Sequence, residues 1–297
     1  MAKQPDVAEL FAGRGDQPPR ETIVIPDEIR AESGRLYEIG DRIAAGGNGV
    51  VHRCVDLNDG TEYAIKFLLD LRQHRRARFA RERALLAELK HEHLIVYQDY
   101  GEVVGELRRQ RGKRGGQKSV PFIVMILATE ALTDLVKRAD VPKEIFLAQF
   151  RGLAEGLGEL HTKAIHRDIK PDNILVVGDR WVLSDYGLCD MLGLPAEERM
   201  TPDWEVVGPR FWMSPEANNR SIGRDDTIDA ASDVFQLASV FWFVVNRSHP
   251  TGVLSRDDWR GPDALFEPIF RALHHRPDIR PADGSAFASQ IDAAIVG

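Results

Sequence analysis

From Leu36 onward, the first part of the chain consists of short apolar runs that are separated by turn residues. This pattern is typical of antiparallel strands that are joined by tight connections. Five strands are expected, at residues 37–44, 50–56, 63–69, 95–101 and 122–127. A helix from about Arg75 to Leu89 is expected between the third and fourth strands, because its apolar residues recur at helical spacing.

Beyond Ala128 the apolar positions take on a helical period. One buried stripe is predicted from the spacing of Phe146, Phe150, Leu153, Leu157 and Leu160. Later helices are expected at residues 234–245, 265–273 and 287–295. The order predicts an α+β chain with a strand-rich lobe at 34–127, a mainly helical lobe at 128–297 and a cleft between them.

Two segments stand outside this pattern. Residues 1–33 contain several prolines and glycines and only one strand-like run, 22–25, so we interpret them as an N-terminal extension that is partly ordered at best. Residues 106–118 are rich in arginine, lysine and glycine, which predicts a long exposed hairpin loop. This loop either is solvated without a partner or docks an acidic one.

Composition narrows the class of protein. With 43% hydrophobic and 29% charged residues the chain is an ordinary globular one, and a net charge of −7 argues against a nucleic-acid partner. Two cysteines, Cys54 and Cys189, are too few for a disulfide framework. The N-terminus lacks signal-peptide features and the most apolar run, 234–245, is too short for a membrane span, so a cytoplasmic location is expected.

A glycine-rich turn and a lysine are the first candidates for chemistry. Three glycines lie in the segment Ile43-Ala-Ala-Gly-Gly-Asn-Gly-Val-Val51, where backbone N–H groups without a neighbouring Cβ can approach phosphate oxygens. A glycine turn in a hairpin is also commonly only a turn. Lys66 ends the strand Tyr63-Ala-Ile-Lys66, and the alternation of a strand puts it on the same side as Ala64.

A carboxylate lies on the apolar face of the first helix. Glu82 shares this face with Phe79, Leu85, Leu86 and Leu89. Burial of an unpaired carboxylate is costly, so Lys66 is its natural partner, and the pair would hold the ammonium where it contacts phosphates. The alternative is a glutamate at the edge of the stripe that reaches water.

The most specific segment is His166-Arg-Asp-Ile-Lys-Pro-Asp-Asn173, which is followed by Asp185-Tyr-Gly187. Phosphoryl transfer requires an oxygen acceptor that orients the attacking hydroxyl, hard oxygen ligands for Mg²⁺ and positive charge at the transferred group. Asp168 can provide the acceptor. Asn173 and Asp185 can provide the metal ligands, and Lys170 with Lys66 the positive charge.

On these motifs the chain resembles the eukaryotic-type protein kinase superfamily, including its bacterial members, from about Leu36 to Ile295. The resemblance implies the bilobal protein kinase fold and transfer of the γ-phosphoryl group of Mg-ATP to a protein substrate. It implies that Asp168 is the catalytic base, that Asn173 and Asp185 bind Mg²⁺, and that Lys66 and Glu82 anchor the phosphates. The nucleotide-binding residues that it implies are Ile43, Gly46, Gly47, Asn48, Gly49, Val51, Ala64, Met125 as gatekeeper, Ile126, Ala128 and Leu175.

Other segments agree with the resemblance. Trp212-Met-Ser-Pro-Glu216 resembles the element that closes the activation segment, and Arg280 resembles its buried ion-pair partner. Asp233 matches the aspartate that braces the catalytic loop. Three departures, Ala44, Tyr186 and Ile126, change no reacting group.

Signals for the acceptor residue conflict. Lys170 in the catalytic-loop motif resembles the residue of serine/threonine kinases at this position, whereas Pro209 and Trp212 resemble the residues of tyrosine kinases. Because Lys170 lies next to the chemistry and Pro209 only near the acceptor, we favour serine/threonine specificity, with tyrosine or dual specificity left open.

A regulatory site is expected on the activation segment. Arg167 beside Asp168 resembles kinases whose activation loop is ordered by a phosphate. Thr201 is the only hydroxyl residue between Gly187 and Gly208, so we predict its autophosphorylation, which in trans would require self-association. The alternative is an unmodified threonine, with the active form held by the acidic residues Glu198, Asp203 or Glu205.

Two other classes of function remain to be separated. A pseudokinase scaffold is disfavoured because all of the expected reacting residues are present. A small-molecule kinase of the antibiotic-phosphorylating kind is disfavoured by the segment 212–216, which resembles a platform for peptides.

Overall fold

The structure is a computed structural model that describes residues 7–11, 21–46, 49–109, 113–138, 141–193, 211–220 and 222–296. The chain divides into two compact units. The N-terminal unit comprises residues 1–87 and 96–127, and the C-terminal unit comprises residues 88–95 and 128–297.

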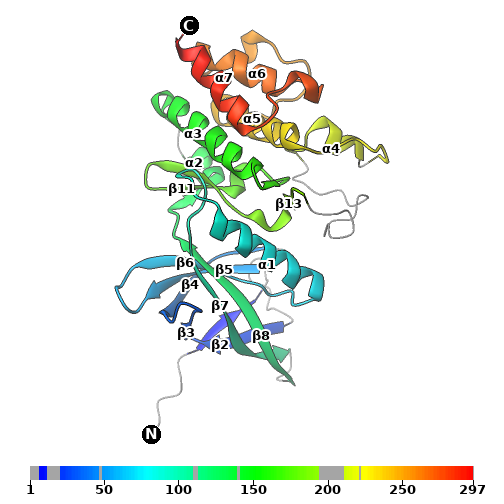
Figure 1. The fold of residues 1–297 in the computed structure, drawn as a ribbon. Helices are drawn as coiled ribbons and strands as arrows, with labels where there is room; N and C mark the ends of the chain where they lie inside the picture. The colour runs from blue at the N-terminus through cyan, green and yellow to red at the C-terminus, as the bar shows by residue number, and fades with distance from the viewer. Residues whose placement is uncertain are drawn as a thin grey trace. The chain divides into compact units, whose positions relative to one another are not determined.

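One eight-stranded antiparallel sheet forms the frame of the N-terminal unit, in the order β1-β2-β7-β8-β6-β5-β4-β3 (Figure 1). Its strands are β1 (Val7–Leu10), β2 (Glu21–Pro26), β3 (Glu28–Arg30), β4 (Leu36–Gly46), β5 (Gly49–Asp56), β6 (Glu62–Phe67), β7 (Tyr97–Arg109) and β8 (Lys113–Ile126). The predicted meander is confirmed, because β4, β5 and β6 are neighbours in this order. Gly60 has a φ of 75° in the turn that joins β5 and β6.

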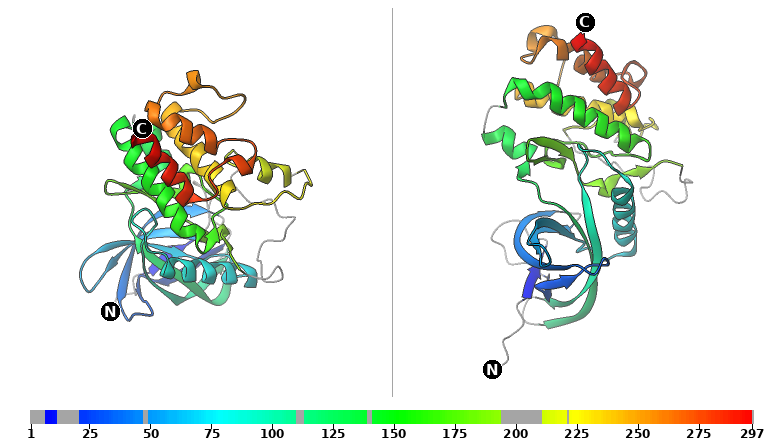
Figure 2. Two further views of the ribbon diagram at one scale, coloured as in Figure 1. Left: turned by 45° about the horizontal axis from the view of Figure 1, so that its top comes forward. Right: turned by 60° about the vertical axis from the view of Figure 1, so that its left-hand side comes forward.

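The N-terminal segment is part of this sheet. Strand character extends beyond the predicted run 22–25 to all of β1, β2 and β3. A single residue, Asp27, separates β2 from β3, although β3 is the last strand at one end of the sheet and β2 is the second strand from the other end. The sheet therefore curls until these regions meet, as the right-hand view of Figure 2 shows.

The curled sheet encloses an apolar core to which every strand contributes. One buried residue from each strand, in chain order, illustrates this: Leu10, Ile25, Ile29, Tyr37, Cys54, Phe67, Val103 and Phe122. Burial raises the pKa of the Cys54 thiol to about 12, so this cysteine is a packing residue at neutral pH. The segment that the sequence suggested to be a loose extension thus supplies three strands of a shared core.

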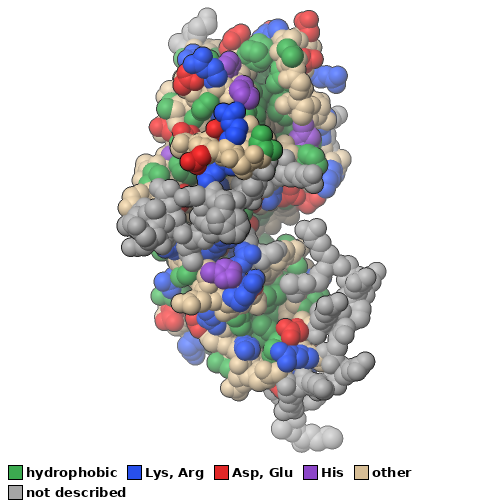
Figure 3. Space-filling model, turned by 90° about the vertical axis from the view of Figure 1, so that its right-hand side faces the viewer, with side chains coloured by type: hydrophobic (Ala, Val, Ile, Leu, Met, Phe, Trp, Pro, Cys, Tyr) green, Lys and Arg blue, Asp and Glu red, His purple; other side chains and the backbone are tan. Residues whose placement is uncertain are grey.

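The expectation of a long exposed loop at 106–118 is wrong for most of its length. β7 continues to Arg109 and β8 begins at Lys113, so the described residues of this segment are paired strands. Arg109 contacts Glu21 at 2.9 Å on the neighbouring strand β2, and Arg108 contacts Glu9 at 4.0 Å on β1, the next strand beyond it. Basic and acidic side chains are likewise interspersed on the face drawn in Figure 3.

Helix α1 (Gln73–Glu88) belongs almost entirely to the N-terminal unit, and its apolar stripe is buried as predicted. Residues 88–95, which we expected in the strand-rich lobe, group with the C-terminal unit instead. Hydrogen bonds to Leu183 and Trp181 explain this: Ile95 N–H donates to the Leu183 carbonyl at 2.9 Å, and His93 Nδ1 lies 2.8 Å from the Trp181 carbonyl.

The C-terminal unit is mainly helical (Figure 1). Its helices are α2 (Leu132–Arg138), α3 (Lys143–His161), α4 (Pro215–Arg220), α5 (Ala230–Asn246), α6 (Phe266–Ala272) and α7 (Gly284–Val296), and its short strands are β9 (Glu130–Ala131), β10 (Ala164–Ile165), β11 (Ile174–Val177), β12 (Arg180–Leu183) and β13 (Asp190–Met191).

The core of this unit forms where α3 meets α5 and α7. The predicted stripe on α3 is buried, and its Phe150 stacks on Phe241 of α5 with ring centroids 4.0 Å apart. Phe241 in turn stacks on Phe287 of α7. Among the described residues, no helix has the length and apolarity to cross a bilayer.

Candidate functional site

The glycine-rich turn connects β4 to β5, and its two described glycines differ in the space around them. Gly46 pairs with Gly49 across the turn, and a Cβ on Gly46 would meet nothing within 4 Å. Gly49 has a φ of 137°, and a Cβ there would lie 2.1 Å from the Phe67 carbonyl oxygen, so only glycine fits. Gly47 and Asn48 lie outside the described residues.

Lys66 and Glu82 form the expected ion pair within the N-terminal unit. Lys66 lies on β6 with its side chain on the face opposite Ile65 and Phe67, which enter the apolar core. Its Nζ is 2.5 Å from Glu82 Oε1 on α1, and both side chains are buried. A buried pair of this kind fixes the ammonium at one position on the sheet.

The residues expected around an adenine ring in this unit lie on four adjacent strands, β4, β5, β6 and β8. Val51 faces Lys66 in the register of β5 and β6, and Ala64 faces Met125 in the register of β6 and β8. Ile43 is half-exposed on β4. The N–H of Ile126 donates to the Val96 carbonyl at 3.0 Å, so this N–H is already engaged within the unit.

Ala128 and Leu175 belong to the C-terminal unit. Leu175 lies on β11, where it pairs with Ala131 of β9 and Val182 of β12, and both Ala128 and Leu175 are partly exposed.

Helix α5 holds the loop that carries Asp168 through hydrogen bonds. Asp233, near the start of α5, is fully buried and accepts hydrogen bonds from the backbone N–H groups of His166 at 2.6 Å and Arg167 at 2.8 Å. His161 Nε2 is 3.1 Å from Asp233 Oδ2, and it carries the proton because Nδ1 accepts from Gly284 N–H. The bracing predicted for Asp233 is confirmed.

Three of the predicted catalytic-loop residues meet at one carboxylate. Lys170 Nζ lies 3.0 Å from Asp168 Oδ1 and 2.9 Å from Oδ2. Asn173 Nδ2 donates to Asp168 Oδ2 and to the Asp168 carbonyl, both at 2.8 Å. Oδ2 thus accepts two hydrogen bonds and Oδ1 one, so Oδ1 has the greater capacity to accept a further proton donor.

Two residues of the predicted site have left-handed backbone conformations. Arg167 has a φ of 70° and Asp185 a φ of 61°. Such conformations cost free energy in non-glycine residues and persist where the surroundings determine them, which is common at functional sites. At Arg167 the surroundings are the hydrogen bonds from α5.

Asp185 is tied to Asn173 through the residue before it. Ser184 donates to the Asn173 carbonyl from both its N–H and its Oγ, each at 2.9 Å. Because Nδ2 of Asn173 is engaged by Asp168, its Oδ1 is presented as an oxygen ligand. A carboxamide oxygen and the Asp185 carboxylate are the hard ligands that Mg²⁺ takes together with water and phosphate, so these residues fit that ion.

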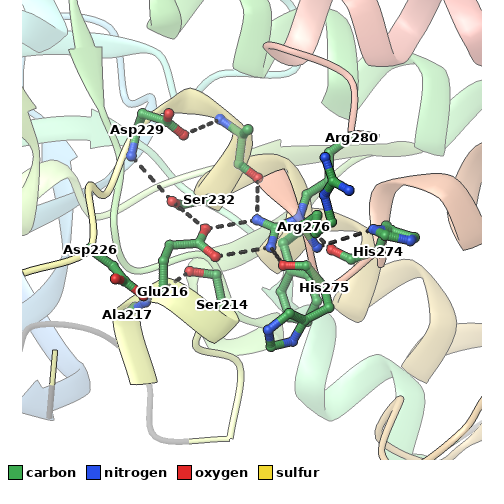
Figure 4. A network of polar contacts seen from close by, with 12 residues as sticks. Ser214, Glu216, Ala217, Asp226, Asp229, Ser232, His274, His275, Arg276 and Arg280 are labelled. Atoms are coloured by element: carbon green, nitrogen blue, oxygen red, sulfur yellow. Dashed lines mark hydrogen bonds and ion pairs between the residues drawn. The ribbon is translucent and has the colours of Figure 1, made fainter. Parts of the chain in front are cut away.

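Arg280 and Glu216 form the buried ion pair that was expected, in the network of Figure 4. Two parallel hydrogen bonds of 2.7 and 2.9 Å join the guanidinium to the carboxylate, and Ser232 donates to the same carboxylate at 2.6 Å. Burial opposes ionisation of Glu216, but the hydrogen bonds from Arg280 and Ser232 outweigh it and lower the pKa.

Arg167 is buried beside the segment that leads toward the activation loop. Its Nη1 is 4.0 Å from Asp190 Oδ2, and its Nε has no hydrogen-bond partner among the described residues. Burial lowers the pKa of this guanidinium, partly offset by Asp190 and Asp233. Thr201 and Pro209 lie outside the described residues.

One polar contact at the loop was not anticipated. Gln236 of α5 is buried, and its Oε1 accepts a hydrogen bond from Ile169 N–H at 3.0 Å. A signal for it was available, because Gln236 interrupts an apolar helix and lies three residues after Asp233, on the same face.

Comparison with known proteins agrees with this geometry. The family model for the protein kinase domain matches residues 37–266. The chain therefore belongs to the protein kinase family, and its α+β class is that of the bilobal kinase fold.

Curated relatives narrow the resemblance. Over 189 residues the chain is 32% identical to the serine/threonine-protein kinase pak-1 of Caenorhabditis elegans and 31% identical to the serine/threonine-protein kinase PAK 1 of Mus musculus. The aligned region is 63% of this chain, and it spans 30% and 31% of these two relatives.

Proposed function

We propose that this chain is an active protein kinase that transfers the γ-phosphoryl group of Mg-ATP to serine or threonine hydroxyls of a protein substrate. The observation that carries the proposal is the arrangement at Asp168, where a lysine and an asparagine converge on one buried carboxylate. This is the arrangement that phosphoryl transfer to a hydroxyl requires.

In this proposal Asp168 orients the acceptor hydroxyl and receives its proton at Oδ1. Lys170, which is only partly buried, remains able to turn toward the transferred phosphoryl group. Its positive charge would stabilise the negative charge on that group. Mg²⁺, held by Asn173 and Asp185, would neutralise charge on the phosphates.

The residues of the N-terminal unit would act on the same nucleotide. Lys66, held by Glu82, would bind two phosphates, and the backbone of the turn 46–49 would cover them. Apolar side chains would contact the two faces of the adenine ring, namely Ile43, Val51, Ala64 and Leu175, with Met125 behind it. Backbone groups of Ile126 and Ala128 would hydrogen-bond its edge.

Serine/threonine specificity is supported by Lys170 and by the names of both relatives, which are serine/threonine-protein kinases. Pro209 and Trp212 are the features that favour tyrosine instead. Phosphoamino-acid analysis separates the two.

We further propose that phosphorylation of Thr201 regulates the enzyme. The support is Arg167, a buried cation next to Asp168 whose Nε lacks a partner among the described residues. A phosphate would offer strong acceptors to such a guanidinium. Autophosphorylation in trans would require that two copies associate.

A cytoplasmic location likewise stays a prediction.

The deciding experiment incubates the full chain with Mg-ATP and a mixture of serine, threonine and tyrosine peptides, and maps the phosphosites by mass spectrometry. Asp168→Asn and Lys66→Ala are run in parallel, with Asp179→Asn as control because that side chain is exposed in the turn between β11 and β12. We expect Asp168→Asn to lower kcat by about 10²- to 10⁴-fold, the usual contribution of a general base.

Wild-type labelling of serine and threonine alone, lost in both site variants and kept in Asp179→Asn, would support the proposal. Unchanged labelling in Asp168→Asn would contradict the assigned base. A wild-type chain that binds ATP but transfers no phosphate would favour a pseudokinase. A fully active preparation with unmodified Thr201 would remove the regulatory proposal alone.

A further inference from the structure

Helix α5 contacts the loop around Asp168 through two polar side chains, Asp233 and Gln236. Asp233 binds the N–H groups of His166 and Arg167, which precede Asp168. Gln236, one turn further along α5, binds groups on both sides of Asp168. Gln236 itself carries neither charge nor a metal ligand for the proposed phosphoryl transfer.

The carboxamide of Gln236 contacts both peptide groups of Asp168. Its Oε1 accepts from Ile169 N–H at 3.0 Å, which is the peptide after Asp168. Its Nε2 is 3.5 Å from the Arg167 carbonyl, which is the peptide before Asp168. Because Oε1 is fixed as the acceptor for an N–H group, the orientation of the amide follows from the contacts.

These two peptides determine where the Asp168 side chain points. Arg167 has a left-handed φ of 70°, a conformation that costs about 1–3 kcal/mol and lasts only while the surroundings hold it. The N–H of Asp168 itself is held by His166 Nδ1 at 3.3 Å, a long contact. Without Gln236, the peptide after Asp168 would lose its bond to α5.

We infer that Gln236 is a positioning residue for phosphoryl transfer: it fixes the two peptide groups of Asp168 and thereby the direction of the catalytic carboxylate. The inference rests on the proposed function of Asp168. A positioning role of Gln236 differs from a stabilising role, because a small rotation of either peptide would displace Asp168 Oδ1 without unfolding the helix. Displacements near 1 Å cost about 10²-fold in rate.

The chain contains a matched control. Gln149 on α3 is a buried glutamine that also binds two backbone groups: its Nε2 donates to the Asp179 carbonyl at 2.9 Å, and its Oε1 accepts from Trp181 N–H at 2.9 Å. The exposed fractions are 7% for Gln149 and 4% for Gln236. Gln→Met at either position removes two hydrogen bonds and keeps the length of the side chain.

The experiment compares Gln236→Met and Gln149→Met in the full chain by thermal melting, steady-state kinetics and amide hydrogen exchange. We expect similar losses of Tm in both variants. Only Gln236→Met should lower kcat, by about ten- to hundredfold, with the KM for ATP within about twofold of wild type. Only this variant should show faster exchange at the Ile169 amide.

Equal losses of kcat in the two variants, or a Gln236→Met enzyme with wild-type kcat, would overturn the inference while leaving the kinase assignment intact. Absence of phosphotransfer in the wild-type chain would overturn the proposed function itself, and the inference with it. If Gln236→Met folds poorly, Gln236→Glu provides a second test, because its carboxylate keeps an acceptor for Ile169 N–H. Per folded molecule, Gln236→Glu should have a higher kcat than Gln236→Met. The reverse order would count against the inference.

Discussion

Arg280 and Glu216 are joined by two parallel hydrogen bonds inside the C-terminal unit, 64 residues apart in the sequence. Neither side chain is appreciably exposed. The guanidinium also donates to the carbonyls of Ala231, His274 and His275. The pair therefore links the start of α4, the start of α5 and the segment after α6 at one point.

Removal of one partner should be strongly destabilising. Arg280→Ala removes the cation from the buried Glu216 carboxylate and the donor from the buried Ala231 carbonyl, and we expect a loss of about 3–5 kcal/mol in the free energy of unfolding. Arg276→Ala is the control, since its pair with Asp278 is exposed on both sides and should contribute nothing measurable. Denaturant unfolding of both variants tests this, and equal midpoints would contradict it.

The strands of the N-terminal segment should matter for stability. Ile25 of β2 is 1% exposed in the core of the curled sheet, so Ile25→Ala should cost about 2–5 kcal/mol. Val7 of β1 is 50% exposed, and Val7→Ala should have little effect. Melting curves of the two variants test whether β1 and β2 contribute to the folded unit, and silence of both substitutions would contradict this prediction.

Local periodicity was enough to predict several elements. The α3 stripe and the β4–β5–β6 meander were predictable because their apolar residues recur at one spacing over many positions. The pair Lys66–Glu82 was predictable for a different reason: a carboxylate on an apolar helix face requires a cation when it is buried.

Contacts between distant segments were not predictable in this way. The prolines and glycines of residues 1–33 indicate loops locally, whereas their strands are stabilised by pairing with β7 and β4. The charge of 106–118 likewise indicated a loop, but Arg108 and Arg109 find acidic partners on β1 and β2. No spacing within either segment shows which distant strand it will meet.

Stability of the C-terminal unit should depend on pH through His93. Burial lowers the pKa of this imidazole below its ordinary value of about 6.5, with His91 and Arg180 acting in the same direction and Trp181 and Glu92 opposing. Below about pH 6.5 the unfolded chain therefore binds a proton at His93 that the folded chain does not bind. The free energy of unfolding should be highest above about pH 6.5 and should fall as the pH drops below this value.

His93→Asn tests this dependence, because the Asn amide can still donate to the Trp181 carbonyl but does not titrate. Its unfolding free energy should vary less steeply between pH 7 and 5.5, by up to about 1.4 kcal/mol per pH unit. Chemical denaturation at several pH values gives the slopes. Identical slopes for the variant and the wild type would exclude His93 as the source.

The ion pair Lys66–Glu82 should be required for catalysis, but it should not make the protein more stable than an apolar pair at the same positions would. Glu82→Leu removes the carboxylate that lies 2.5 Å from the buried Lys66 ammonium and should cost about 3–5 kcal/mol. The double variant Lys66→Met/Glu82→Leu replaces both charged groups by apolar ones and should be near or above wild-type stability. Both variants should lack phosphotransfer. A double variant as unstable as Glu82→Leu would mean that the pair itself holds β6 to α1, and an active double variant would mean that the phosphates are bound without Lys66.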